Sequence, residues 1–151
     1  MRKKEKEVTD ISVMEAQLQK AEIMRLAFCD ADEPYIVPVC FGYKEGKIFV
    51  HSAKEGRKLE IIKRSNKVCF EVDAYKIVKK ELPCKWTIDY TSVIGLGDAI
   101  LVDERERKRE ALDAIMAHYG ALPPFEYSEV ALAKTLILEI AVRSMTCKRS
   151  L

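Results

Sequence analysis

The chain has no long hydrophobic run and no strong excess of charge of either sign. Its longest apolar stretch, Leu136 to Val142, contains Glu139 and is far shorter than the roughly 20 residues that a membrane-spanning helix needs. The net charge is only +2, from 26 lysines and arginines against 24 aspartates and glutamates. A dedicated nucleic-acid binder usually carries a larger basic excess. We therefore expect neither a membrane nor a nucleic acid as a partner.

Closely spaced metal ligands are also missing. The five cysteines form no C-x-x-C pair, and His51 and His118 are far apart in the sequence. A structural zinc site needs ligands in close pairs. The charged N-terminal residues are not followed by the apolar segment of a secretory signal. We therefore expect free, buried thiols, no metal site and a cytoplasmic protein.

What the sequence does contain is enough apolar residues for one globular domain. It has 151 residues, of which 48% are hydrophobic, so a chain of this length can bury a core without disulfides or metals. The sequence predicts a single domain over residues 1–151, with residues 1–8 as a frayed tail.

Alternating apolar and polar residues dominate the middle of the chain and predict strands. We expect strands at 24–29, 35–43, 47–52, 67–74, 86–102 and 136–142. Helical patterns are shorter, and we expect helices at 9–22, 53–65, 103–119 and 128–134. The short turns between strands indicate antiparallel neighbours. The fold class is therefore mainly β, a closed or partly closed antiparallel barrel with peripheral helices.

The segment His51 to Lys58 is the strongest candidate for binding an anion. Ser52 and Glu55 have the spacing of a capping box, which places the start of a helix directly after a strand. Three cations, Lys54, Arg57 and Lys58, lie in or beside its first turn, where they oppose the helix dipole unless an anion is present. The other interpretation is a solvated basic helix start, and the residues alone leave both open.

Three further features each have a functional and a structural interpretation. Pro38 inside a strand marks either a bulge or an edge whose backbone a flat ligand could approach. His51 at a strand end could contact a cofactor or donate a proton, or be an ordinary strand residue. Gly95-Leu-Gly97 lacks the third glycine of a dinucleotide fingerprint, because Ile100 stands there, and is more typical of barrel bends.

Four segments in this order and spacing resemble the pyridoxamine 5′-phosphate oxidase-like flavin-binding split barrels, in particular the branch of nitroimidazole resistance proteins. They are residues 34–43, 48–58, 68–72 and 90–97, and the segments 111–120 and 144–149 fit the same branch. The resemblance implies a six-stranded antiparallel split barrel that forms a homodimer and binds FMN at the subunit interface.

The resemblance also assigns residues to the cofactor. Backbone groups of Val37, Pro38 and Val39 would line the flavin ring, and His51, Ser52 and Ala53 would flank the ring and the ribityl chain. Ser52, Lys54 and Lys58 would hold the phosphate, while Tyr90, Ser92 and Val93 would complete the pocket across the dimer. Three positions depart from the pattern: Cys40 replaces a common Asn, Thr91 a frequent Arg and Cys147 a usual Gly.

The function implied is an FMN-dependent oxidoreductase that reduces small aromatic or nitro compounds with electrons from NAD(P)H. His51 is the candidate catalytic residue, as an orienting group or a proton donor near the substrate. The segment that binds substrate in true pyridoxamine 5′-phosphate oxidases is absent, so vitamin B6 oxidation is not carried over. Three alternatives stay open: a flavin- or haem-binding protein without turnover, a relative acting on another substrate, and a cofactor-free dimeric barrel.

Overall fold

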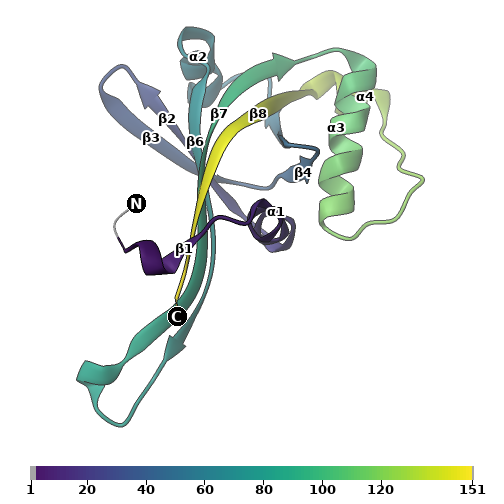
Figure 1. Cartoon of the computed structure of the whole chain (residues 1–151). Coiled ribbons are helices and arrows are strands. Elements are labelled where there is room, and N and C mark those ends of the chain that lie inside the picture. The colour runs from purple at the N-terminus through teal and green to yellow at the C-terminus, as the bar shows by residue number, and fades with distance from the viewer. Residues whose placement is uncertain (1–2, 151) are drawn as a thin grey trace.

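The computed structural model describes residues 3–150 and is built around one antiparallel sheet of eight strands (Figure 1). Seven strands follow the order β3-β2-β6-β7-β8-β5-β4, and β1 pairs with β8. The strands are β1 (Glu7–Val8), β2 (Met24–Asp30), β3 (Glu33–Val39), β4 (Gly42–Lys44), β5 (Lys47–Ala53), β6 (Lys67–Val78), β7 (Thr87–Val102) and β8 (Thr135–Arg149). This is the mainly β split barrel that the sequence predicts.

The barrel is split between β3 and β4, the two strands at the ends of the sheet order. They are consecutive in the sequence and are joined only by Cys40 and Phe41. The sequence predicts one strand over 35–43, and the interruption at these two residues is one reason for eight strands instead of six. The other is β1, in which Glu7 pairs with Lys148 and Val8 with Cys147, so these two residues are not part of a frayed tail.

Apolar side chains fill the inside of the curved sheet. Leu26, Phe41, Phe70 and Val93 have no exposed surface there, and α1 (Ile11–Lys20) adds Met14 and Leu18 to the same core. A second, smaller core lies under α3 (Arg105–His118) and contains Ala111 and Ile137. The remaining helices are α2 (Arg57–Arg64), α4 (Glu129–Lys134) and the short 3₁₀ turns η1 (Lys4–Lys6) and η2 (Pro83–Lys85).

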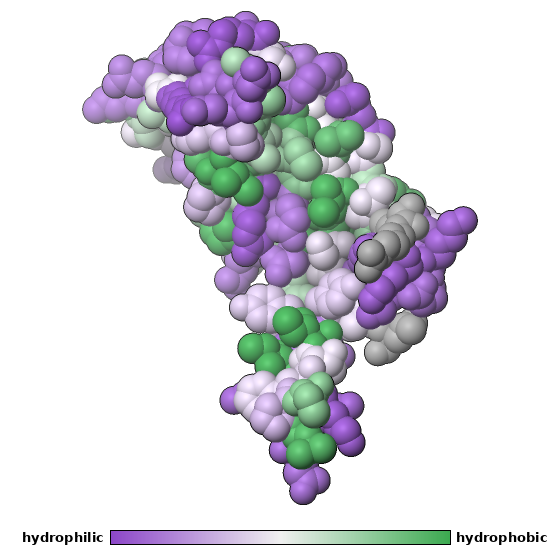
Figure 2. Space-filling view, turned by 90° about the vertical axis from the view of Figure 1, so that its left-hand side faces the viewer, coloured by the Kyte–Doolittle hydropathy of each residue, from purple (hydrophilic) through white to green (hydrophobic). Residues whose placement is uncertain are grey.

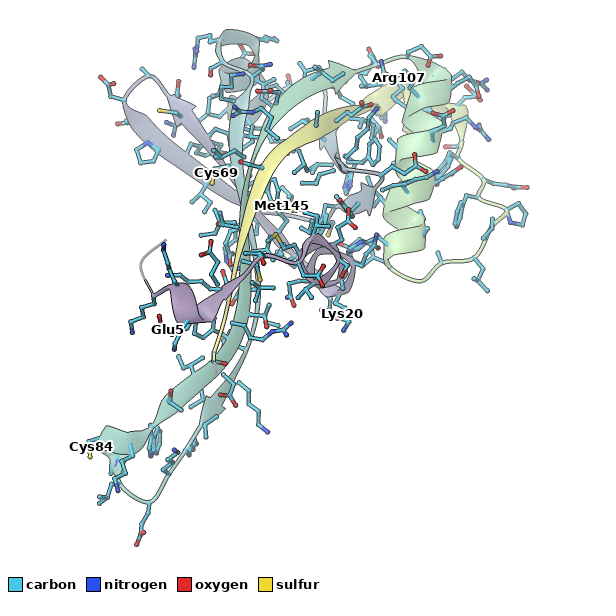
Figure 3. All side chains as sticks on the ribbon, viewed as in Figure 1. Glu5, Lys20, Cys69, Cys84, Arg107 and Met145 are labelled. Carbon is cyan, nitrogen blue, oxygen red and sulfur yellow. The ribbon has the colours of Figure 1, made fainter. Side chains whose placement is uncertain are left out.

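Strands β6 and β7 continue well beyond the barrel as a two-stranded arm, residues 75–90 (Figure 1). Tyr75 pairs with Tyr90 and Ile77 with Ile88, and all but Tyr90 have about half or more of their surface exposed. The sequence predicts a polar connection over 75–85, but the ladder extends to Val78 before η2 turns the chain at the tip. Figure 3 places Cys84 at this tip.

The spacing of Ser12 and Glu15 also predicts a capping box, and both predicted boxes are wrong. Asp10, not Ser12, caps α1, because its carboxylate accepts hydrogen bonds from the backbone N–H and the hydroxyl of Ser12. Ser52 is a strand residue paired with Leu136, since β5 continues to Ala53 and α2 begins only at Arg57. Helix α1 is therefore capped two residues earlier than predicted, whereas α2 begins after Gly56, which has no side chain to cap it.

The cysteines are free, as expected, but most are not buried. Cys147 is buried, Cys69 is partly buried, and Cys29, Cys40 and Cys84 are exposed. Strand alternation explains this, because Cys29 and Cys69 lie on the side of β2 and β6 opposite the core residues Phe28 and Phe70. The β7 glycines do lie at an irregularity, a register shift against β8 between Leu96 and Gly97.

Candidate functional site: the opening between β3 and β5

The opening in the barrel brings together three of the predicted segments. Because Gly42 of β4 pairs with Phe49, the last residues of β5, 51–53, extend past β4 toward the level of β3. Among the strands of residues 3–150, β3 has one hydrogen-bonded neighbour, β2, so the other side of its backbone faces this opening. Of the two interpretations that Pro38 left open, the strand edge is the one observed, and residues 37–39 and 51–53 lie at the two sides of the same gap.

Helix α2 begins at one end of this opening. The Arg57 guanidinium lies 4.7 Å from the centre of the Tyr35 ring on β3 and also pairs with Asp30 and Glu33 at the β2–β3 turn. These contacts fix the start of α2 beside β3, while the β5–α2 loop, residues 54–56, connects it directly to β5. The predicted backbone, strand-end and phosphate residues thus meet around one opening.

The N-terminus of α2 begins at a residue without a side chain. Gly56 precedes the helix with φ of 128°, a conformation that favours glycine, and no side chain among residues 3–150 accepts from the first turn. The first helical hydrogen bonds run from the N–H groups of Leu59 and Glu60 to the Gly56 carbonyl, so those of Arg57 and Lys58 have no helical acceptor. Such free N–H groups at the positive end of a helix dipole attract anions.

The three cations of this segment have different surroundings. Lys54 Nζ lies 2.9 Å from Asp103 Oδ2, and Arg57 is paired with two carboxylates as described. Lys58 is partly buried, and within residues 3–150 its ammonium has no carboxylate partner; desolvation lowers its pKa. Of the three cations, Lys58 is therefore the one that loses hydration without gaining a carboxylate partner among residues 3–150.

Strand alternation separates the residues of β5. Ser52 is 6% exposed and faces the inside, whereas His51 and Ala53 are exposed on the opposite side. Similarly, Val39 is in the core, Val37 is partly buried and Pro38 is exposed. A ligand in the opening could therefore reach these strands chiefly through their backbone and through the side chains of one face.

Tyr90, Ser92 and Val93 do not lie at this opening. Strands β2 and β6 separate β3 from β7, which corresponds to about 14 Å at ordinary strand spacing. Val93 is fully buried in the core. Tyr90 and Ser92 face outward and line adjacent hollows of about 300 Å³, with Lys148, and about 390 Å³, with Tyr75. In one chain, the predicted cofactor residues therefore form two separate groups.

Two residues near the opening, Asp103 and Lys108, are not predicted from the sequence. Asp103 directly follows β7 and contacts both Lys54 and the buried Lys108 of α3. Lys108 did leave a signal, because it stands three, four and seven residues before Ala111, Leu112 and Ile115 on the apolar face of α3. No local pattern points to Asp103, since its role depends on Lys54, which is distant in the sequence.

Two negative findings apply to the described residues. No group of three or more His, Cys, Asp or Glu side chains within residues 3–150 is placed to hold a metal ion. None of the helices in that range combines the length and the apolar character needed to cross a membrane.

The comparisons with known proteins agree with this architecture. The chain superimposes with a TM-score of 0.84 on a candidate 5-nitroimidazole antibiotic resistance protein from Bacteroides thetaiotaomicron, at 30% identity over 94% of this chain and 85% of that one. A FAD- and haem-binding protein from Mycobacterium smegmatis gives 0.83 at 20% identity, covering 96% of this chain and 73% of its own. A flavocytochrome from Azotobacter vinelandii gives 0.82 at 17% identity, covering 100% and 72%.

The sequence itself gives the same assignment. No curated protein matches it closely enough to be informative. The family model described as pyridoxamine 5′-phosphate oxidase, however, matches residues 11–149, which run from the first residue of α1 to the last of β8. The chain therefore belongs to the pyridoxamine 5′-phosphate oxidase family.

Proposed function

We propose that the protein binds FMN in the opening between β3 and β5, with the FMN phosphate at the N-terminus of α2. The observation that carries this proposal is the uncapped helix start with Lys58 beside it. A phosphate there would accept hydrogen bonds from the free N–H groups and would compensate the desolvated Lys58 ammonium. That the phosphate belongs to a flavin is inferred from the family and from the similarity to a FAD- and haem-binding protein.

The residues around the opening fit the remaining parts of the cofactor. The free edge of β3 at Val37 to Val39 offers backbone donors and acceptors to a flat ring, and Ser52 offers a hydroxyl. Bound FMN would supply hydride and electron transfer. The role of the chain is then to fix the ring against β3 and to leave one of its sides accessible to a second molecule.

We further propose that the protein is a reductase of small aromatic or nitro compounds that takes electrons from NAD(P)H. The similarity to the candidate nitroimidazole resistance protein supports this substrate class. His51 is exposed at the end of β5, and we assign it the role of orienting such a substrate or donating a proton to it.

A homodimer would join the two separated groups of site residues. Tyr90 and Ser92 line hollows on the outward side of β7, and Lys148 lies beside them. The outward side of the sheet also exposes apolar residues, among them Ile36, Ile94 and Leu96. Packing this side against a second copy would bring Tyr90 and Ser92 of one subunit toward the opening of the other.

The spectrum of the purified protein tests the cofactor and the reaction. We expect a flavin absorption band that bleaches on addition of NADPH or NADH and returns when a nitroaromatic acceptor is added. A Soret band in place of the flavin band would favour haem binding. A flavin band that no nicotinamide donor bleaches would contradict the reductase and leave flavin binding.

Lys58→Ala tests the position of the phosphate. The variant should bind FMN about tenfold or more weakly while riboflavin binding stays nearly unchanged, because only FMN carries the phosphate. Lys63→Ala is the matched control, since Lys63 lies on the same helix but is exposed and paired with Glu60. Equal losses for FMN and riboflavin in Lys58→Ala would place the phosphate elsewhere.

His51→Ala tests the catalytic assignment separately. We expect the variant to retain flavin, as judged by its absorption after gel filtration, and to lose about 100-fold in turnover, the range usual for a general acid. Full turnover with bound flavin would remove His51 from the mechanism.

A further inference from the structure

Three charged side chains from distant parts of the chain meet next to the β5–α2 loop. Asp103 Oδ2 accepts from Lys54 Nζ at 2.9 Å, and Asp103 Oδ1 accepts from Lys108 Nζ at 2.9 Å. Lys54 follows β5, Asp103 follows β7 and Lys108 is in the first turns of α3. In Figure 1 the end of β7, the start of α3 and helix α2 lie at the same end of the barrel.

Lys108 is the fixed member of this group. It is 4% exposed, and its ammonium also donates to the carbonyls of Leu132 at 2.6 Å and Thr135 at 3.2 Å. All three donors of the ammonium are therefore satisfied, which is the condition for keeping a charge in a buried position. Because the two carbonyls belong to the end of α4 and the start of β8, Lys108 is anchored by the fold itself.

Asp103 connects this anchor to the loop. Its side chain is 54% exposed, and the hydrogen bond from Lys108, followed by that from Lys54, holds the pKa of its carboxyl below the usual value. The carboxylate thus stays ionised with one oxygen on the buried lysine and the other on Lys54. Lys108 thus fixes the Asp103 carboxylate, and the carboxylate in turn holds the Lys54 ammonium.

The charge balance distinguishes Lys54 from Arg57. Arg57 and Arg64 share Asp30, and Arg57 also pairs with Glu33, so two cations meet two carboxylates at the β2–β3 turn. Lys54 and Lys108 share the single carboxylate of Asp103, which leaves one positive charge in excess. The contact with Asp103 therefore restrains Lys54 without cancelling its attraction for an anion.

We propose that Asp103, anchored by Lys108, is a positioning residue that holds Lys54 at the phosphate end of the site and thereby favours FMN over riboflavin. This inference rests on the proposed FMN site. A free lysine has four side-chain torsions to restrict before it can donate to a phosphate, and a lysine already held by Asp103 has fewer. Two of its three ammonium donors remain available for the ligand.

The test compares the affinities for FMN and riboflavin, measured by quenching of flavin fluorescence on the flavin-free protein. Asp103→Ala should weaken FMN about fivefold to tenfold and change riboflavin less than about twofold. In a Lys54→Ala background the same change should have no further effect on FMN, because the residue that Asp103 positions is gone. Asp103→Asn, which keeps the shape and one acceptor oxygen, should recover part of the FMN affinity even if Asp103→Ala is unstable.

Glu139→Ala is the matched control. Glu139 also joins two cations, Lys47 and Arg107, each at 2.8 Å, but it pairs with Phe49 and lies four residues along β8 from Thr135, or about 13 Å. It should change neither affinity. Equal FMN and riboflavin losses in Asp103→Ala, or unchanged or tighter FMN binding, would overturn the positioning role alone. A wild-type protein that binds neither flavin would overturn the proposed function and this inference together.

Discussion

The two faces of the central sheet differ sharply in how far the chain covers them itself. On the inner face, Leu26, Phe70 and Val93 have no exposed surface, because the curvature of the sheet and helix α1 enclose them. On the outer face, formed by the opposite side of β2, β3, β6 and β7, Ile36 is 60%, Ile94 48% and Leu96 45% exposed. The strands are the same, so the difference lies only in what packs against each face.

The outer face is not uniform. Strand pairing places Ile36, Ala27, Cys69 and Leu96 in one row across four strands. Next to this row, on the side toward the arm, lies a charged zone in which Arg25 pairs with Glu71 and Asp73 and Ser92 donates to Glu71. The exposed apolar residues of the arm lie beyond this zone. Figure 2 shows the hydrophobic, hydrophilic and hydrophobic surfaces in this order, and Figure 3 shows Cys69 directed to the same side.

The two faces therefore have different roles, the inner one in the stability of the single chain and the outer one in the proposed assembly of two chains. The inner face accounts for the packing that stabilises one chain. The outer face presents an apolar surface of the kind that marks a protein–protein interface, in agreement with the proposed homodimer. Changes on the two faces should therefore affect different measurements.

The largest effect is expected on the inner face, at Phe70. Phe70→Ala should lower the free energy of unfolding by about 3–5 kcal/mol in urea titrations, because it removes a fully buried ring. Gly95→Ala should cost about 1–3 kcal/mol, since a methyl group there would lie 2.1 Å from the Phe70 Cζ atom. Leu122→Ala, at a loop residue that is 85% exposed, is the control and should stay within about 0.5 kcal/mol. A Phe70 loss no greater than this control would contradict the assignment of the core.

An intermediate effect is expected on the outer face, at Ile94. Ile94→Glu should raise the dissociation constant of the proposed dimer about tenfold or more, because a carboxylate would be buried between two copies. Sedimentation over a range of concentrations measures this, and Leu122→Glu, on the loop between α3 and α4, should leave assembly unchanged. A wild-type chain that stays monomeric at all concentrations, or an unaffected dimer in Ile94→Glu, would show that this face has another role.

The inner face was predictable from the sequence, and so was most of the fold. The alternation of Val68, Phe70 and Val72 with polar residues identifies the buried side of β6 without any tertiary information. Outward-facing residues were harder to interpret. The exposed apolar residues of the arm follow the same period, but the sequence does not show that the two strands continue their pairing beyond the barrel.

The candidate site was predictable only in part. Its segments, 37–39 and 51–58, could be identified because local patterns and the family resemblance point to them. The exact helix start could not, because the β5–β8 ladder extends to Ala53 and competes with the Ser52 capping box. The contacts of Arg25 with Glu71 and of Lys54 with Asp103 join residues 46 and 49 positions apart. Such pairs depend on the topology of the sheet and are not visible in local sequence.

The smallest effect is expected from a titration on the inner face, at Tyr43. Burial, followed by the hydrogen bond from its hydroxyl to Glu15 at 2.7 Å, raises the pKa of Tyr43 to about 12 from an ordinary value of 10.0. Because the folded pKa is above the unfolded one, the stabilisation is fully present below pH 10 and is lost as the pH rises from 10 to 12.

Tyr43→Phe should therefore cost about 1 kcal/mol at neutral pH, the usual contribution of one hydrogen bond. The difference in unfolding free energy between wild type and variant should shrink between pH 10 and 12. Urea titrations at fixed pH values measure it. The two proteins share every other titrating group, so this difference reports on Tyr43 alone. If the difference in unfolding free energy stays constant over this range, Tyr43 titrates as it does in the unfolded chain. The inner face would then be more accessible to water at Tyr43 than its burial indicates.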